Sequence, residues 1–237
     1  MRDRRKIFWI FCGLAALMFV MRGLHGNIGH RLIMEILMIP GMLIGLSFHE
    51  YAHGIVAYKL GDPTPKFQGR LTVNPKAHVD PIGFIALLFI GFGWGKAVEI
   101  NPYNFKKPRR DEMLVAFAGV TMNFIIAIVF SIVFKLLSMA GIVNMTMYGL
   151  GGYLGLIILY IVQINVVLMI FNLLPVPPLD GFGIVTEIFD LKRKPWYYTV
   201  YNNGFFILMI LLLFNITDLV LTPLVGLVMK LMFAIML

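Results

Sequence analysis

The chain has only one cysteine, Cys12, among its 237 residues. A single thiol cannot form an internal disulfide, and it cannot build a structural zinc site from several thiolates. Charged residues are also scarce, at 14% of the sequence, whereas 59% of the residues are hydrophobic. So few charges around so much apolar surface exclude an ordinary soluble domain and indicate an integral membrane protein. Any metal site must therefore use histidine and carboxylate ligands.

Acidic residues are fewer than basic ones, and the formal net charge is +8. Such an excess can indicate binding to nucleic acid, but here the basic residues form short clusters between apolar segments. Clusters of this kind are typical of the cytoplasmic loops of membrane proteins. We therefore expect a lipid bilayer, and no nucleic acid, as the partner of this surface.

The apolar runs predict an all-α polytopic membrane protein of about six transmembrane helices, at roughly residues 7–22, 32–58, 112–137, 153–174, 197–214 and 218–236. Placing both termini in the cytoplasm leaves Arg22, Arg31 and Lys135 as the only basic residues near the outer side. This predicts a multi-pass protein of the cell membrane, with one domain over residues 1–237. The first apolar run could instead be a cleaved signal peptide, although no clear small-residue cleavage site follows it.

Residues 67–101 do not follow the pattern of a membrane span. Leu71 and Val73 alternate with polar neighbours, a short apolar stretch runs from Pro81 to Phe92, and Val98 and Ile100 alternate again. This pattern favours a small re-entrant segment flanked by short strands. Irregular backbone at membrane depth must line a cavity or pack on protein, and an exposed strand edge could pair with an extended peptide. A merely interfacial loop is the alternative.

The clearest motif is His49-Glu50-Tyr51-Ala52-His53, the H-E-x-x-H pattern of zinc hydrolases, inside an apolar stretch. Residues four apart share one face of a helix, so His49 and His53 can bind the same Zn²⁺. Glu50, one position round the helix, would be the general base toward a water molecule at the metal. In the predicted topology these residues lie near the cytosolic surface, so the active site should open to the cytoplasm.

A catalytic zinc ion usually has a third protein ligand and one open position. Asp180 is the best candidate because it follows Asn172-Leu-Leu-Pro-Val-Pro-Pro-Leu at the inner end of a predicted span. The three prolines prevent the helix from continuing and leave a backbone that can turn a carboxylate toward the metal. Glu35 is about four turns away from the histidines, and Asp62 and Asp80 lie in the predicted cytosolic segment. Their positions fit less well.

The two motifs together resemble the site-2 protease family of intramembrane zinc metalloproteases, in its short bacterial and archaeal form without PDZ or CBS domains. Other stretches are similar too: Gly61-Asp62-Pro63-Thr64, Gly69 to Pro75, Asp80 to Gly83, and Ala118-Gly119-x-x-x-Asn123. The resemblance implies one catalytic Zn²⁺ held by His49, His53 and Asp180, with Glu50 as the base and a catalytic core of about residues 32–190. Phe182 stands where many relatives have another glycine.

Asn123 matches a family asparagine that faces the site. It could bind the oxyanion or the substrate backbone, or it could simply join helices by hydrogen bonds. The resemblance also implies an endopeptidase acting in or near the transmembrane segments of single-span or membrane-anchored proteins, and it allows a regulatory membrane partner.

Two other functions fit a buried His-Glu-His cluster, namely a metal or proton transporter and an inactive metal-binding scaffold. Replacing Glu50 by glutamine would separate them. A protease would lose cleavage and keep its metal, whereas a transporter would still move metal or protons in liposomes.

Overall fold

The computed structural model describes residues 28–90, 93–146 and 148–237. The predicted span at residues 7–22 lies outside this part of the chain. Four described helices are long and apolar enough to cross a membrane: α2 (Ile28–Lys59), α6 (Pro108–Met139), α7 (Gly149–Asn172) and α11 (Asp218–Met236). The prediction of a helical membrane protein is therefore confirmed.

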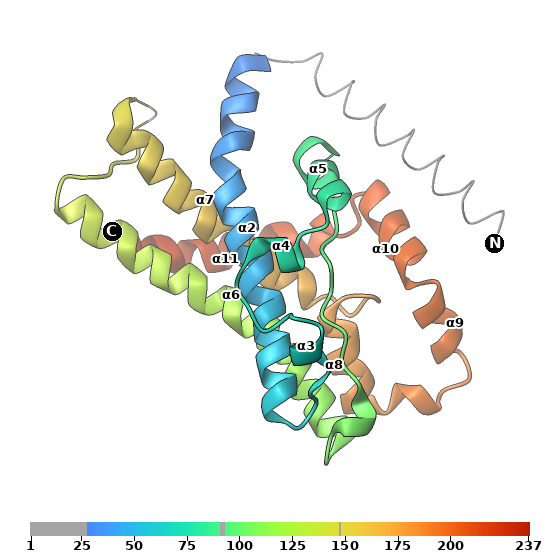
Figure 1. Ribbon diagram of the computed structural model, residues 1–237. Coiled ribbons are helices and arrows are strands. Elements are labelled where there is room, and N and C mark those ends of the chain that lie inside the picture. The colour runs from blue at the N-terminus through green and yellow to red at the C-terminus, as the bar shows by residue number, and fades with distance from the viewer. Residues whose placement is uncertain (1–27, 91–92, 147) are drawn as a thin grey trace.

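Helices α2, α6 and α7 pack on one another, and α11 lies against α6 and α7 (Figure 1). Local sequence sets where these helices begin and end. Helix α6 starts at Pro108, whose missing N–H is tolerated in the first turn, and it is followed by Gly141 with a positive φ of 70°. The apolar core contains buried side chains from α6, α7 and α11, among them Phe134, Val162 and Met232. This bundle is the frame that positions the site.

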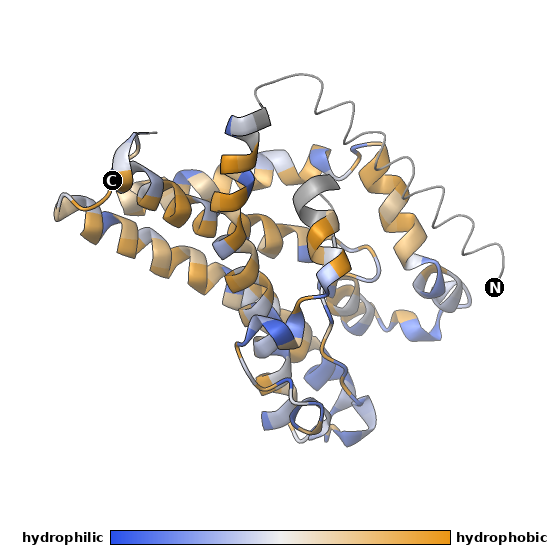
Figure 2. Ribbon diagram, turned by 45° about the horizontal axis from the view of Figure 1, so that its top comes forward, coloured by the Kyte–Doolittle hydropathy of each residue, from blue (hydrophilic) through white to orange (hydrophobic). Residues whose placement is uncertain are grey.

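Shorter elements connect and flank the bundle: α3 (Thr64–Phe67), α4 (Pro75–His78), α5 (Pro81–Ile90), η1 (Pro102–Asn104), α8 (Asp180–Phe189), η2 (Leu191–Arg193), α9 (Tyr197–Asn202) and α10 (Gly204–Leu213). Hydrophobic residues dominate the long helices, and hydrophilic residues gather at the end of the molecule that contains α3 and α8 (Figure 2). The molecule therefore has one polar end.

The six predicted spans are confirmed only in part. Those at 32–58, 112–137, 153–174 and 218–236 correspond to α2, α6, α7 and α11. The run at 197–214 is divided into α9 and the ten-residue α10, because Asn202, Asn203 and Gly204 interrupt its apolar sequence. A ten-residue helix is about 15 Å long, which is shorter than the hydrocarbon core of a bilayer.

The predicted strands within 67–101 are not confirmed either. The described residues contain no strand, and one isolated antiparallel bridge joins Val79 to Gly95. Residues 95–101, which we call the pocket segment, run beside α2 without helical turns (Figure 1). Lys96 donates its N–H to the carbonyl of His78 at 2.7 Å, and Asn101 donates its N–H to Asp62 Oδ2 at 2.7 Å. Protein groups other than a second strand thus hold this segment.

Candidate metal centre

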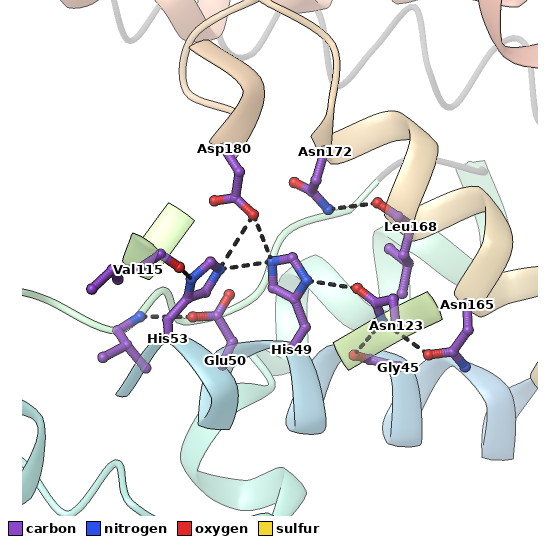
Figure 3. A network of polar contacts seen from close by, with 11 residues as sticks. Gly45, His49, Glu50, His53, Val115, Asn123, Asn165, Leu168, Asn172 and Asp180 are labelled. Atoms are coloured by element: carbon purple, nitrogen blue, oxygen red, sulfur yellow. Dashed lines mark hydrogen bonds and ion pairs between the residues drawn. The ribbon is translucent and has the colours of Figure 1, made fainter. Parts of the chain in front are cut away.

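His49 and His53 lie on one face of α2 and point toward Asp180, the first residue of α8 (Figure 3). Asp180 Oδ2 is 3.3 Å from the Nε2 atom of each histidine, and the two Nε2 atoms are 3.0 Å apart. Both histidines are buried. The structure therefore brings together the three ligands that the sequence predicts, from helices that are far apart in the chain.

The second nitrogen of each imidazole is already bonded on the side away from Asp180. His53 Nδ1 lies 2.7 Å from the carbonyl oxygen of Val115, which can only accept, so His53 donates. His49 Nδ1 lies 2.6 Å from Asn123 Oδ1 and donates to it. In a neutral imidazole the proton on Nδ1 leaves Nε2 with a free lone pair. Both Nε2 lone pairs therefore face the Asp180 carboxylate.

Asn123 is fully buried on α6 and does not reach the pocket described below. Its Nδ2 donates to the carbonyl of Gly45 at 3.1 Å and to Asn165 Oδ1 at 2.9 Å. These bonds leave Oδ1 facing His49 and connect α2, α6 and α7 (Figure 3). The oxyanion role of Asn123 stays a prediction. Its hydrogen bonds in this structure are to His49 and Gly45 of α2 and to Asn165 of α7.

Gly119 provides the space in which the two imidazoles sit. A Cβ atom at this position would lie 2.5 Å from His53 Nε2 and 2.6 Å from His49 Cε1. Helix α6 can therefore cross beside the site only if residue 119 has no side chain. Gly181 is similarly confined, since its Cβ would lie 2.2 Å from the carbonyl oxygen of Leu173.

Glu50 lies beside the two histidines and is partly exposed. One oxygen of its carboxylate, Oε2, accepts a hydrogen bond from the backbone N–H of Val98 at 2.8 Å. Figure 3 shows the other oxygen turned toward the space between the imidazoles and Asp180. The side chain therefore lies where a base acting on a water molecule at this site would have to be.

A pocket of about 630 Å³ opens onto these residues. His49, Glu50, His53 and Asp180 line it, together with Ala97 and Val98 of the pocket segment. Tyrosines of α9 line another part of its wall. The pocket therefore reaches the candidate ligands directly.

A charged cluster fixes the far end of α8. Lys192 Nζ lies 2.8 Å from Glu112 of α6 and 2.6 Å from Glu187 of α8. Burial alone would lower the pKa of Lys192, but the hydrogen bonds and charges of Glu112 and Glu187 outweigh it and raise that pKa. Arg109 binds the carbonyls of Glu187 and Ile188 at the C-terminal end of α8. Helix α8, which begins with Asp180, is thus tied to α6.

The three candidate ligands fit a zinc ion. A tetrahedral Zn²⁺ lies about 2.0–2.2 Å from each ligand atom, so those atoms should be roughly 3.3–3.5 Å apart. The two separations that involve Asp180 are 3.3 Å, close to this value, and the two Nε2 atoms are somewhat closer together, at 3.0 Å. Asp180 Oδ2 is buried and accepts no hydrogen bond from the described residues. A bound cation would satisfy this atom and both nitrogen lone pairs.

The sequence pattern did not identify the groups behind the ligands. Asn165 was detectable in principle, because an asparagine within an apolar membrane helix usually has a specific partner. No sequence pattern predicts that the carbonyl of Val115 contacts His53 or that the imidazoles lie against Gly119. Both contacts follow from the way α6 crosses α2.

Fold and site together are those of a helical membrane protein with a candidate centre for one metal ion. Residues 134–215 match the model of peptidase family M50. The chain is 36% identical over 185 residues to the Bacillus subtilis protein named "Putative zinc metalloprotease YwhC". The match covers 78% of this chain and 84% of that protein. Because this similarity covers most of both sequences, the chain belongs to peptidase family M50, the site-2 protease family.

Two mycobacterial relatives named "Putative zinc metalloprotease Rip2" are more distant. The Mycobacterium tuberculosis H37Rv protein is 29% identical over 154 residues, and the Mycolicibacterium smegmatis protein is 27% identical over 185 residues. The first match covers 62% of this chain and 55% of its relative, and the second covers 75% and 67%. No solved structure matches the chain. The family is therefore assigned from sequence, and the site geometry comes from this structure.

Proposed function

We propose that the chain is a zinc-dependent intramembrane endopeptidase whose metal ligands are His49, His53 and Asp180. The observation that carries the proposal is the convergence of two imidazole lone pairs and one carboxylate oxygen within 3.0–3.3 Å of one another. Such an arrangement is repulsive unless a proton or a cation occupies its centre. The relatives named as zinc metalloproteases support zinc as that cation.

A bound zinc ion would supply Lewis acidity and would bring the pKa of a water molecule toward neutrality. The protein supplies the other requirements. Glu50 accepts the proton of the attacking water and delivers it to the leaving amine. Asn123 and the carbonyl of Val115 hold the two imidazoles so that their Nε2 atoms face the centre.

The substrate we propose is a membrane-anchored or single-span protein, bound as an extended peptide in or near its transmembrane segment. In a helix each peptide bond is shielded by its neighbours, so the substrate must unwind before attack. The pocket segment lies at the side of the pocket, where it could pair with an extended backbone. The identity of the substrate and of any regulatory membrane partner stays open.

We further propose that the whole chain is a single membrane domain and that the pocket opens to the cytoplasm. The polar end of the molecule holds α3 and α8, near the Lys106–Arg110 and Lys192–Lys194 clusters (Figure 2). Basic clusters of this kind favour the cytoplasmic side. In this topology both termini are cytoplasmic, so the number of crossings must be even. With the predicted span at 7–22 and the four long helices, a sixth crossing is needed, and the region at 197–214 would supply it as two helical pieces, α9 and α10, instead of one continuous helix.

The test uses the full chain in liposomes with a membrane-anchored reporter. Glu50→Gln should abolish cleavage and keep the bound zinc, whereas His49→Ala should lose both. Glu35→Gln, a matched change on the same helix away from the site, should cleave like the natural chain. Retained cleavage in the Glu50→Gln variant, or a zinc content that His49→Ala does not reduce, would refute the proposal.

A further inference from the structure

The contact between Glu50 and Val98 connects the base to the pocket segment. Glu50 Oε2 accepts the backbone N–H of Val98 at 2.8 Å. A glutamate side chain has three rotatable bonds, and ordering it carries a substantial entropy cost. A fixed donor on one oxygen selects one orientation and leaves the second oxygen available (Figure 3).

Successive backbone N–H groups of the pocket segment differ in whether the protein supplies a hydrogen-bond acceptor. Lys96 and Val98 donate to protein groups, the carbonyl of His78 and the carboxylate of Glu50. Ala97, between them, donates none of the hydrogen bonds found among the described residues. The N–H of Val98 is therefore occupied by the protein, whereas Ala97, which also lines the pocket, keeps an N–H that could bond to a substrate there.

Asp62 holds the far end of the same segment. Its buried carboxylate accepts the N–H of Asn101 at 2.7 Å and the side chain of Asn104 at 2.7 Å. The segment is thus attached at Lys96, Val98 and Asn101. A segment attached on both sides of Val98 can keep that N–H in one place.

We propose that the backbone N–H of Val98 is a positioning group for Glu50, and that the N–H of Ala97 is the one left to pair with substrate. This inference rests on the proposed function, because it assigns a role relative to the base of that reaction. Two adjacent amides of one segment then have separate tasks, one acting on turnover and the other on binding. An error of about 1 Å in the position of a catalytic group can cost roughly a hundredfold in rate.

Proline substitution tests this division, because proline removes a backbone N–H. Val98→Pro should lower kcat on the anchored reporter about tenfold to a hundredfold and change KM less than about twofold. Ala97→Pro should raise KM severalfold and leave kcat within about twofold. Zinc content and Tm, measured on both full-length variants in detergent, should stay near those of the natural chain. A general loss of structure would instead lower kcat, zinc content and Tm together.

Two comparisons isolate the lost hydrogen bond. Val98→Ala keeps the N–H, so its kcat should exceed that of Val98→Pro by about tenfold to a hundredfold. Val73→Pro introduces a proline at an exposed position outside the pocket and should behave like the natural chain. If Val98→Pro does not fold, replacing residue 98 by the hydroxy-acid analogue of valine removes only the N–H, and the same fall in kcat is expected.

The outcomes separate this inference from the function on which it rests. If Glu50→Gln is inactive but Val98→Pro or the hydroxy-acid variant has a normal kcat, Val98 is not a positioning group and the protease assignment stands. A change confined to KM in these variants would mean that Val98 contacts the substrate instead, and the inference would be wrong. If the natural chain with zinc fails to cleave any anchored reporter, the proposed function itself fails.

Discussion

The Nδ1 atom of His49 lies 2.6 Å from Oδ1 of Asn123, so a buried amide fixes the orientation of a candidate metal ligand. Loss of such a supporting contact typically costs about 10–100-fold in metal affinity. We expect Asn123→Ala to weaken zinc binding by about this factor, as measured by competition with a chelator of known affinity. Asn203→Ala is the matched control, because Asn203 Nδ2 donates to the carbonyl of Thr199 in α9 and Asn203 does not line the pocket. An unchanged zinc affinity in Asn123→Ala would contradict the role.

Gly119 should tolerate no side chain. The Cβ atom of Gly119→Ala would overlap His53 Nε2 at 2.5 Å and would displace the imidazoles from Asp180. The purified variant should contain little or no zinc while keeping its helical circular dichroism. Gly226→Ala on α11 is the control, since nothing lies within 4 Å of its Cβ. Full zinc occupancy in Gly119→Ala would show that the site can shift to accommodate a methyl group.

Asp62 should make stability sensitive to acid. Burial alone would raise its pKa, but the hydrogen bonds from Thr64, Asn101 and Asn104 outweigh burial and hold the pKa below its usual value. A carboxyl whose pKa is lowered by folding contributes stability above its unfolded pKa of about 3.9 and loses it as the pH falls toward the folded value. Thermal unfolding in detergent should therefore show a Tm that drops below about pH 4.

Asp62→Asn should lower Tm at neutral pH and flatten its dependence on acid. Asparagine keeps one carbonyl oxygen but cannot accept all four hydrogen bonds of the carboxylate. Each donor left buried without an acceptor costs about 1–3 kcal/mol. Asp218→Asn, which changes the first turn of α11 instead, controls for the lost charge. An identical acid profile in Asp62→Asn would assign the transition to other carboxyls.

Lys192 should stabilise the position of α8. Lys192→Met would leave Glu112 and Glu187 without their shared cation, and because the cluster is partly exposed we expect a cost of about 1–2 kcal/mol. The variant should show a lower Tm and weaker zinc retention, since α8 begins with Asp180. Lys194→Met, an exposed neighbour, should change neither. The raised pKa of Lys192 means that the lysine is charged at neutral pH and that its contribution is lost as the pH rises through that raised pKa.

The sequence predicted which candidate ligands lie together better than it predicted their surroundings. His49 and His53 are four apart, and this spacing is sufficient to place them on one helix face. Asp180 follows prolines that end α7, so a turn toward the motif was expected. By contrast, Gly119 meets the imidazoles only because α6 crosses α2 at that point, and no local pattern encodes that crossing.

Two predicted elements are not confirmed, and each has a physical reason. The apolar content of residues 197–214 suggested a span, but Asn202, Asn203 and Gly204 provide polar groups and flexibility that break the helix. The alternation at Val98 and Ile100 suggested a strand, but among the described residues no neighbouring strand supplies a ladder. The N–H groups of Val98 and Asn101 instead donate to the carboxylates of Glu50 and Asp62.

The separation of the ligands along the chain has a consequence for biosynthesis. Protein synthesis proceeds from the N-terminus, so α2 with its two histidines is made and inserted before α6 and α7. Asp180 is synthesised later still. Before that, the nascent chain contains only two of the three proposed ligands, His49 and His53. With the proposed ligands, the metal centre cannot be completed, and peptide bonds cannot be cleaved, until residue 180 has been synthesised.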